Sequence, residues 1–190
     1  QINFKFEDTI GLLPLFALNF DGYKKIIELS SKSYLKNDDI SDPNLDINDL
    51  FELENTGISI FSGTISGLFG RLFDKGKFTE INNFYKKLNS IFKDRFYLEI
   101  QRHNDHNEYE FEKFNLNQSK KLEIPIIATN EVFYLTKDMH EAHDALICIG
   151  NKTYINEKNR TKDSSDHYLK DDSRMSELFS DFPEALENNY

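Results

Sequence analysis

The sequence predicts an α/β protein in which helices surround a mostly parallel sheet. Short apolar runs alternate along the chain with stretches whose apolar residues recur at helical spacing. This alternation, rather than a block of strands followed by a block of helices, favours parallel strands joined by helical crossovers. The 190 residues are about the size of one domain and can bury a sizeable core.

Four apolar runs are predicted as the strands of this sheet, and polar or turn-forming residues follow them: 12–18, 57–62, 95–101 and 124–129. We expect these strands to be parallel neighbours, or near neighbours, in one sheet. The carboxyl ends of parallel strands meet at one edge, and such sheets carry their functional groups there.

The segment 77–92 has the clearest helical pattern in the chain. Its apolar residues repeat at i, i+3, i+4 and i+7, and they are Ile81, Phe84, Tyr85, Leu88, Ile91 and Phe92. We expect Ile81, Phe84, Leu88 and Phe92 to pack on the sheet. Further helices are predicted over 22–35, over 107–122, over 137–150, and from the N-cap residue Asp46 through Leu53, after a polar loop over 36–46.

The alternation of strands and helices stops at Gly150. A polar stretch follows, and two short helical pieces begin near Ser173 and Pro183. We therefore divide the chain into residues 1–150, which carry the sheet, and residues 151–190, which form a polar excursion and a helical joint. Because the chain starts at Gln1 without a Met and stops inside a helix-like stretch, we interpret it as a piece of a longer protein.

The composition limits the kinds of partner that this segment can have. Its net charge of −10 repels phosphate backbones, which argues against a primary nucleic-acid groove. The single cysteine, Cys148, excludes an internal disulfide and a cysteine-cluster zinc site, and it fits a reducing cytoplasm. Neither a signal peptide nor an apolar run near the ~20 residues of a membrane span is present. We expect a cytoplasmic segment without a membrane partner.

Polar side chains follow three of the predicted strands: Ser62; Gln101, Arg102 and His103; and Thr129, Asn130 and Glu131. A histidine and an acid at neighbouring strand ends can bind a divalent metal, since imidazole and carboxylate suit Zn, Mn or Mg. The alternative is that these residues cap loops and bond the backbone. Two ligands, His103 and Glu131, are by themselves too few for a catalytic centre.

The helix over 137–150 carries two histidines and an apolar stripe. Its HEAH motif, His140 to His143, lacks the four-residue spacing of the HExxH zinc motif, so we interpret His143 as a hydrogen-bonded helix residue and His140 as exposed. Cys148 is interpreted as an inert core thiol, because no cation adjoins it. The apolar stripe shares one helix face and consists of Met139, Ala142, Leu146 and Ile149.

Five stretches, in this order, resemble one family: ALNFDGYKKIIELSSKSYL, DRFYLEIQRH, IPIIATNEVFYL, MHEAHDALICIG and HYLKDDSRMSELFSDFPEALENN. Together they resemble the amino-terminal polymerase and histidinol phosphatase (PHP) domain of bacterial DNA polymerase III alpha subunits, over nearly the whole chain. The wording AHDALICIG and HYLK is similar to the alphaproteobacterial branch of these proteobacterial proteins.

The resemblance implies a distorted (β/α) barrel, here incomplete, with His, Asp and Glu metal ligands at the carboxyl ends of its strands. The family's first strand, with its His-x-His ligands, is missing from this chain. Members that keep the cluster hydrolyse phosphoesters or excise 3′ nucleotides with several metal ions. In this alignment His103 matches a family histidine and Glu131 the acid of the Asp-x-His pair, whereas Phe133 and Leu12 stand where histidines are expected.

The resemblance therefore implies a vestigial metal site, His103 and Glu131, with no catalytic residues and no tightly bound metal in this segment. Zn²⁺ or Mn²⁺ is expected only if the site is active, and Mg²⁺ is expected for the polymerase as a whole. The implied protein is a DNA-directed DNA polymerase, a nucleotidyltransferase of chromosomal replication. This segment is its scaffold and docking surface for the rest of the alpha chain and for a proofreading exonuclease subunit, and DNA is contacted through other domains.

Two alternatives stay open for the function of this chain. The first is an active metal-dependent 3′–5′ exonuclease or phosphoesterase that uses His103 and Glu131. The second is a free-standing PHP phosphatase acting on small phosphate esters. The sequence from 178 onward, LFSDFPEALENN, weighs against the free-standing enzyme because it is similar to the joint into the polymerase body.

Overall fold

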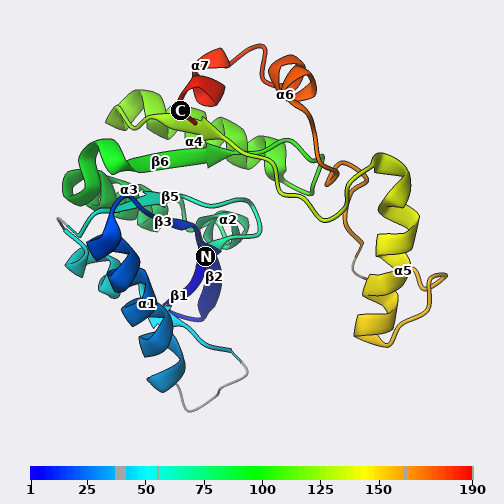
Figure 1. Cartoon of the computed structure of the whole chain (residues 1–190), viewed down its shortest axis with the longest axis horizontal. Coiled ribbons are helices and arrows are strands. Elements are labelled where there is room, and N and C mark those ends of the chain that lie inside the picture. The colour runs from blue at the N-terminus through cyan, green and yellow to red at the C-terminus, as the bar shows by residue number, and fades with distance from the viewer. Residues whose placement is uncertain (37–41, 55, 161, 190) are drawn as a thin grey trace.

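A computed structural model describes residues 1–36, 42–54, 56–160 and 162–189, and it confirms the α/β class. Residues 37–41 of the polar loop predicted over 36–46 lie outside the described residues. The described strands form two sheets that do not close into a barrel (Figure 1). This arrangement agrees with a distorted barrel of the PHP type.

The larger sheet has the strand order β3 (Leu15–Ala17), β5 (Ile58–Phe61), β6 (Phe96–Ile100) and β7 (Ile126–Ala128). Strands β5, β6 and β7 are parallel, as the alternation with helices predicted. Strand β3 pairs with β5 in the antiparallel direction, so the prediction that all four strands are parallel is wrong for β3.

The smaller sheet was not predicted. It contains β1 (Ile2–Phe6), β2 (Thr9–Leu13) and β4 (Leu45–Asp46) in the order β2-β1-β4, and β1 and β2 form an antiparallel hairpin. The single strand predicted over 12–18 is also wrong, because Pro14 separates β2 from β3 and each joins a different sheet. Proline lacks the N–H that a continuous strand would donate, which explains the break.

The described helices lie along the sheets, apart from the fifth, which stands away from them (Figure 1). They are α1 (Phe20–Leu35), α2 (Leu68–Asp74), α3 (Phe78–Phe92), α4 (Glu108–Leu122), α5 (His140–Asn151), α6 (Asp172–Leu178) and α7 (Pro183–Glu187), with 3-10 turns η1 (Ile47–Glu52), η2 (Lys93–Arg95) and η3 (Lys137–Met139). Helix α1 begins where the side chain of Asn19 accepts the N–H of Gly22. None of the described helices is both long and apolar enough to cross a membrane.

Helix α3 packs into the main core. Ile81, Tyr85, Leu88 and Phe92 are fully buried, and Phe84 is partly buried against the same core. The predicted inward face is therefore confirmed, with Tyr85 added to it. A second, smaller core of Ile100, Ala128, Phe179 and Ala185 joins α6 and α7 to the ends of β6 and β7.

Helix α5 stands away from both sheets, at the far end of the molecule in Figure 1. Its apolar stripe is exposed to solvent, with Leu146 64% and Ile149 74% exposed, whereas Asp144 and Cys148 are buried. The helix is held by the excursion that follows it, because both oxygens of the Asp144 carboxylate accept hydrogen bonds from Arg160. The stripe that the sequence shows on this helix thus covers no part of the described core.

Candidate metal centre

The carboxyl ends of β6 and β7 bring His103 and Glu131 together. Because these strands are parallel neighbours, the segments that follow them leave the sheet at the same edge. The ring Nε2 of His103 lies 3.2 Å from the backbone nitrogen of Glu131 and 3.1 Å from Oδ1 of Asn130. The two residues singled out from the sequence therefore lie side by side.

Both ring nitrogens of His103 already have partners. Nδ1 lies 3.3 Å from Oε1 of Glu108, and Oε2 of the same carboxylate accepts the backbone N–H of His103 at 2.7 Å. Glu108 thus favours the tautomer with hydrogen on Nδ1, and Nε2 is left to accept the N–H of Glu131. The lone pair that a metal would need is directed at a peptide N–H. In this arrangement His103, which is 1% exposed, links the segment after β6 to the start of α4 and to the segment after β7.

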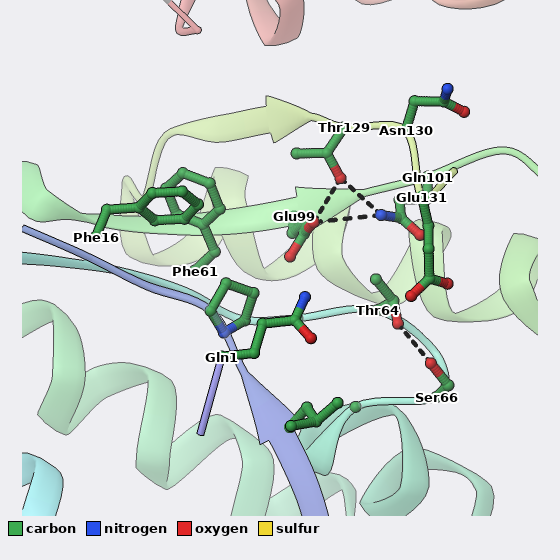
Figure 2. A pocket seen from close by; sticks show the side chains of 14 residues that line it. Gln1, Phe16, Phe61, Thr64, Ser66, Glu99, Gln101, Thr129, Asn130 and Glu131 are labelled. Atoms are coloured by element: carbon green, nitrogen blue, oxygen red, sulfur yellow. Dashed lines mark hydrogen bonds between the residues drawn. The ribbon is translucent and has the colours of Figure 1, made fainter. Parts of the chain in front are cut away.

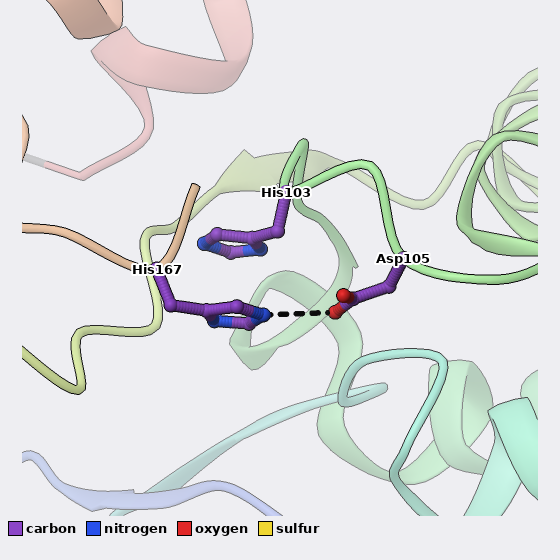
Figure 3. A group of neighbouring side chains, drawn as sticks. All are labelled: His103, Asp105 and His167. Atoms are coloured by element: carbon purple, nitrogen blue, oxygen red, sulfur yellow. Dashed lines mark hydrogen bonds and ion pairs between the residues drawn. The ribbon is translucent and has the colours of Figure 1, made fainter. Parts of the chain in front are cut away.

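Two further residues complete the cluster, and neither was predicted from the sequence. Nε2 of His167 lies 3.0 Å from Oδ2 of Asp105, and the His167 ring stacks on that of His103 at 4.2 Å between centroids and 2° between planes (Figure 3). One donor atom each from His103, Asp105 and His167 lies within 4.8 Å of the other two. This is a grouping of nitrogen and oxygen donors of the kind that binds divalent metals.

The second ring nitrogen of His167 has no hydrogen-bond partner. Nδ1 is buried, the residue is 2% exposed, and the nearest charged oxygen is Oε2 of Glu131 at 3.9 Å. Burial lowers the pKa of His167, but the hydrogen bond to Asp105 and the charge of Glu131 outweigh it, so that this pKa is raised. Burial also raises the pKa of Glu131. An unpartnered ring nitrogen and a carboxylate oxygen thus lie on the two sides of this gap.

Phe133 occupies the place where the resemblance implies a histidine ligand, and its ring packs on His167. The two centroids are 4.5 Å apart with planes at 16°, and Phe133 also stacks on His143 at 5.3 Å. His103 and Phe133 lie on opposite faces of the His167 imidazole, since both rings stack on it at short distance. The imidazole is therefore held between two flat rings, which fixes its orientation.

A pocket of about 200 Å³ opens beside the cluster, with Glu131 on its wall (Figure 2). On the same wall the hydroxyl of Thr129 donates to Oε1 of Glu99 and accepts from the Gln101 amide at 2.7 Å. Oε2 of Glu99 is buried without a partner, and burial raises the pKa of Glu99 to about 7. Leu12 also lines this pocket and offers it only an aliphatic side chain.

The histidines of α5 hold the chain rather than joining the cluster. Nε2 of His140 lies 3.0 Å from the carbonyl oxygen of Asp163, and Nε2 of His143 lies 3.3 Å from Oδ2 of the same residue. His143 is hydrogen-bonded as the sequence indicated, whereas His140 is half-buried rather than exposed. Cys148 is buried, in agreement with its interpretation as a core thiol.

The local sequence gives only a weak signal for Asp105 and His167. Asp105 lies in a stretch rich in acids and histidines that resembles a solvated surface, and His167 lies in the polar excursion. His167 reaches the site because its carbonyl oxygen accepts the backbone N–H groups of Phe133 and Tyr134, and Tyr134 then bridges to Tyr168. A pairing between segments more than 30 residues apart cannot be derived from either segment alone.

The fold and the strand-end cluster define the class of protein, and a comparison with protein families agrees. The model of the PHP domain matches residues 3–103, and this chain belongs to that family.

Among characterised relatives, the chain is similar to proteins named DNA polymerase III subunit alpha. It is 32% identical to that of Caulobacter vibrioides over 93% of this chain and 15% of the relative. It is 35% identical to that of Rickettsia conorii over 98% of this chain and 16% of the relative. It is 34% identical to that of Vibrio cholerae over 97% of this chain and 16% of the relative. The resemblance stated from the sequence is confirmed. The chain spans less than a fifth of the length of these relatives.

The donors at the strand ends fit a metal ion of the kind that the PHP fold implies, but not in the expected pairing. The Nε2 lone pair of His103 is used by the backbone of Glu131, and Phe133 supplies no ligand. The unpartnered Nδ1 of His167 and the carboxylate of Glu131 face each other instead. These residues could hold one cation, which would supply charge and a bound water to the pocket.

Proposed function

We propose that this chain is the PHP segment of a DNA polymerase III alpha subunit, a DNA-directed DNA polymerase that acts in chromosomal replication. The observation that carries this proposal is the similarity to alpha subunits over 93–98% of the chain. The net charge of −10 supports an arrangement in which DNA is bound by other domains of the same polypeptide. In such a polymerase, Mg²⁺ serves nucleotidyl transfer outside this segment.

The role that we propose for the segment itself is scaffold and docking surface. The exposed stripe on α5, together with Tyr154 and Ile155 just after it, presents large apolar side chains to solvent. Contiguous apolar surface of this kind marks a protein interface. We propose that the rest of the alpha chain covers it, since the relatives are several times longer than this chain. A proofreading exonuclease subunit is the second proposed partner.

We further propose that the ancestral hydrolytic chemistry of the PHP site has decayed. Catalysis by this family's route needs several ligands that hold two or three ions and leave a position for water. Phe133 and Leu12 offer no ligand atoms, and the His103 ring is bonded to Glu108 and Glu131. The alternatives, an active 3′–5′ exonuclease or phosphoesterase and a free-standing phosphatase, are favoured by the pocket beside Glu131 and by the grouped donors of His103, Asp105 and His167.

The test uses the full-length protein that contains this chain. We expect it to extend a primed DNA template with Mg²⁺ and to show no 3′ excision with Mn²⁺ or Zn²⁺ that depends on His103. An open reading frame that ends shortly after Tyr190, or a full-length protein without primer extension, would contradict the polymerase assignment. Excision that is lost in His103→Ala, while primer extension is kept, would instead establish the exonuclease alternative.

Docking is tested by substituting the α5 stripe. In the full-length protein we expect Leu146→Ser with Ile149→Ser to lower thermal stability or to expose dye-binding apolar surface, because the stripe loses its cover. Leu169, an exposed leucine outside α5, gives the matched control Leu169→Ser. Equal effects of the control and of the α5 variant would remove the argument for docking at this helix.

A further inference from the structure

We propose that Nδ1 of His167 and the carboxylate of Glu131 bind a single divalent transition-metal ion such as Zn²⁺, with Asp105 orienting the imidazole. The site joins the end of β7 to the excursion that carries His167, and it differs from the His103–Glu131 pair that the sequence indicated. The proposal rests on the described side chains alone and does not depend on the polymerase role.

The unpartnered ring nitrogen of His167 is the first observation that supports a bound ion. A buried ring nitrogen without a hydrogen-bond partner is uncommon in folded proteins and calls for an unseen partner. Nδ1 of His167 is such an atom, in a residue that is 2% exposed. Its distance of 3.9 Å from Oε2 of Glu131 is too long for a hydrogen bond. The donor atoms of two ligands on one tetrahedral zinc ion, each at about 2.0–2.2 Å, are about 3.3–3.6 Å apart, so a shift of a few tenths of an ångström closes this gap around an ion.

The carboxylate of Asp105, on the other side of the His167 ring, is the second observation. Metal-binding histidines almost always donate their other N–H to a carboxylate, a carbonyl or a water, which fixes the tautomer and makes the ligand more basic. Oδ2 of Asp105 lies 3.0 Å from Nε2 of His167 and is placed to accept that N–H. The hydrogen then lies on Nε2, and the lone pair of Nδ1 is free on the side of Glu131.

The His167 ring is also held in place before any ion binds. The His167 ring lies between His103 and Phe133, both at stacking distance. Little rotamer freedom is left for the ring to lose on binding. Glu131 is only half-buried and borders the pocket, so it can close the gap by a small movement while waters fill the remaining coordination positions. Phe133 thus serves this site by packing, in place of the ligand that it cannot be.

Two protein ligands and water define a site for one ion. A second ion would require further ligands, and the nearest imidazole, His103, has both nitrogens bonded. We therefore infer a structural ion that tightens the strand-end loops, rather than a hydrolytic pair. The expectation of no tightly bound metal counted only His103 and Glu131, and His167 changes that count.

The experiment titrates the metal-stripped full-length protein with Co²⁺, follows the visible absorption of the bound ion, and then displaces it with Zn²⁺. We expect one saturable ion whose binding weakens at least tenfold in Glu131→Gln and in His167→Phe, the latter keeping a flat ring in the stack. Asp105→Asn should weaken binding by about 10–100-fold, as loss of an orienting carboxylate does. The exposed His106 gives the matched control His106→Gln, which should bind as the wild type does.

Absence of saturable Co²⁺ binding in the wild type would overturn the proposal, because His167 would then be a protonated partner of two carboxylates. Unchanged affinity in a folded Glu131→Gln protein, checked by circular dichroism, would overturn it as well. If His167→Phe does not fold, Glu131→Gln decides the question, since it is nearly isosteric. Primer extension has no part in this readout, so failure of the polymerase assignment would leave the metal result standing.

Discussion

Glu99 lies on the wall of the pocket at the end of β6, and its surroundings change its chemistry. The side chain is nearly enclosed, Thr129 donates to one oxygen, and the other oxygen has no partner. An ionised carboxylate is costly in such a place, because neither water nor a cation compensates its charge. Burial, with a smaller contribution from the neighbouring charge of Glu131, therefore raises the pKa of Glu99 to about 7.

A pH-dependent stability follows from this residue. The folded-state pKa of about 7 exceeds the reference value of 4.5, so the native state retains its proton over a range in which the unfolded chain has lost it. The stabilisation is fully present below about 4.5 and is lost as the pH rises through about 7. We expect Glu99→Gln, which cannot ionise, to gain up to about 3 kcal/mol relative to the wild type between pH 4.5 and 8.

Urea unfolding at about pH 4.5 and about pH 8 measures the difference in stability between Glu99→Gln and the wild type. The control is Glu110→Gln, because Glu110 is exposed. A stability difference between Glu99→Gln and the wild type that is the same at both pH values would show that Glu99 is ionised in the folded protein.

Some residues of the site can be predicted from the sequence and others cannot. His103 and Glu131 follow predicted parallel strands, and strand-end position alone places them together. Asp105 and His167 could not be placed, because their approach depends on how the excursion after Gly150 returns to the segment at 133–134. The same return puts Phe133 on the His167 ring, so a residue that the alignment marks as a loss has a packing role that only the structure reveals.

Local periodicity predicts the helices of this chain correctly, but it does not predict which sheet each strand joins. Helix α3 buries the face that its repeat indicates, whereas the run 12–18 is divided by Pro14 between two sheets. Pairing partners and strand direction are set by contacts far apart in sequence, such as Leu15 with Ile60. A hydrophobic pattern therefore identifies which residues are buried, but it leaves open which sheet buries them.

Leu88 tests the contribution of α3. It is fully buried in the main core, so Leu88→Ala removes apolar contacts and leaves a cavity. We expect the free energy of unfolding to fall by about 2–5 kcal/mol. Lys86→Ala, at an exposed position on the same helix, should change it by less than about 0.5 kcal/mol. Denaturant melts of the two variants make the comparison, and a loss below 1 kcal/mol for Leu88→Ala would mean that α3 is not part of the cooperative core.

Arg102 connects the carboxyl-terminal helices to the rest of the protein. Its guanidinium makes two bonds to the buried carboxylate of Glu112 on α4 and two to Asp181 beyond α6, and it donates to the carbonyl of Leu178. It also lies 4.8 Å from the ring centroid of Phe179 in the smaller core. The division of the chain at Gly150 stays a prediction, but residues 171–189 are held to the first part through this side chain.

The clearest test of that connection is Arg102→Lys, which keeps the charge and loses the planar fork. A lysine ammonium has three N–H donors at one point and cannot form the paired bonds that the guanidinium makes to Glu112 and to Asp181, so Glu112 is left underbonded. We expect the free energy of unfolding to fall by about 1–3 kcal/mol. Most of this loss comes from the pair with buried Glu112, because Asp181 is 53% exposed and its pair with Arg102 is screened by solvent.

Amide hydrogen exchange measures the effect on the carboxyl-terminal helices. Exchange over residues 171–189 should accelerate at least about fivefold while α3 stays protected. The exposed pair of Arg174 with Glu177 on α6 supplies the control Arg174→Lys, which should leave exchange unchanged. Equal protection in both variants would mean that this end of the chain is held without the Arg102 fork, by the apolar contacts of Phe179 and Ala185 and by the hydrogen bonds of Asn188 and Asn189 to β7.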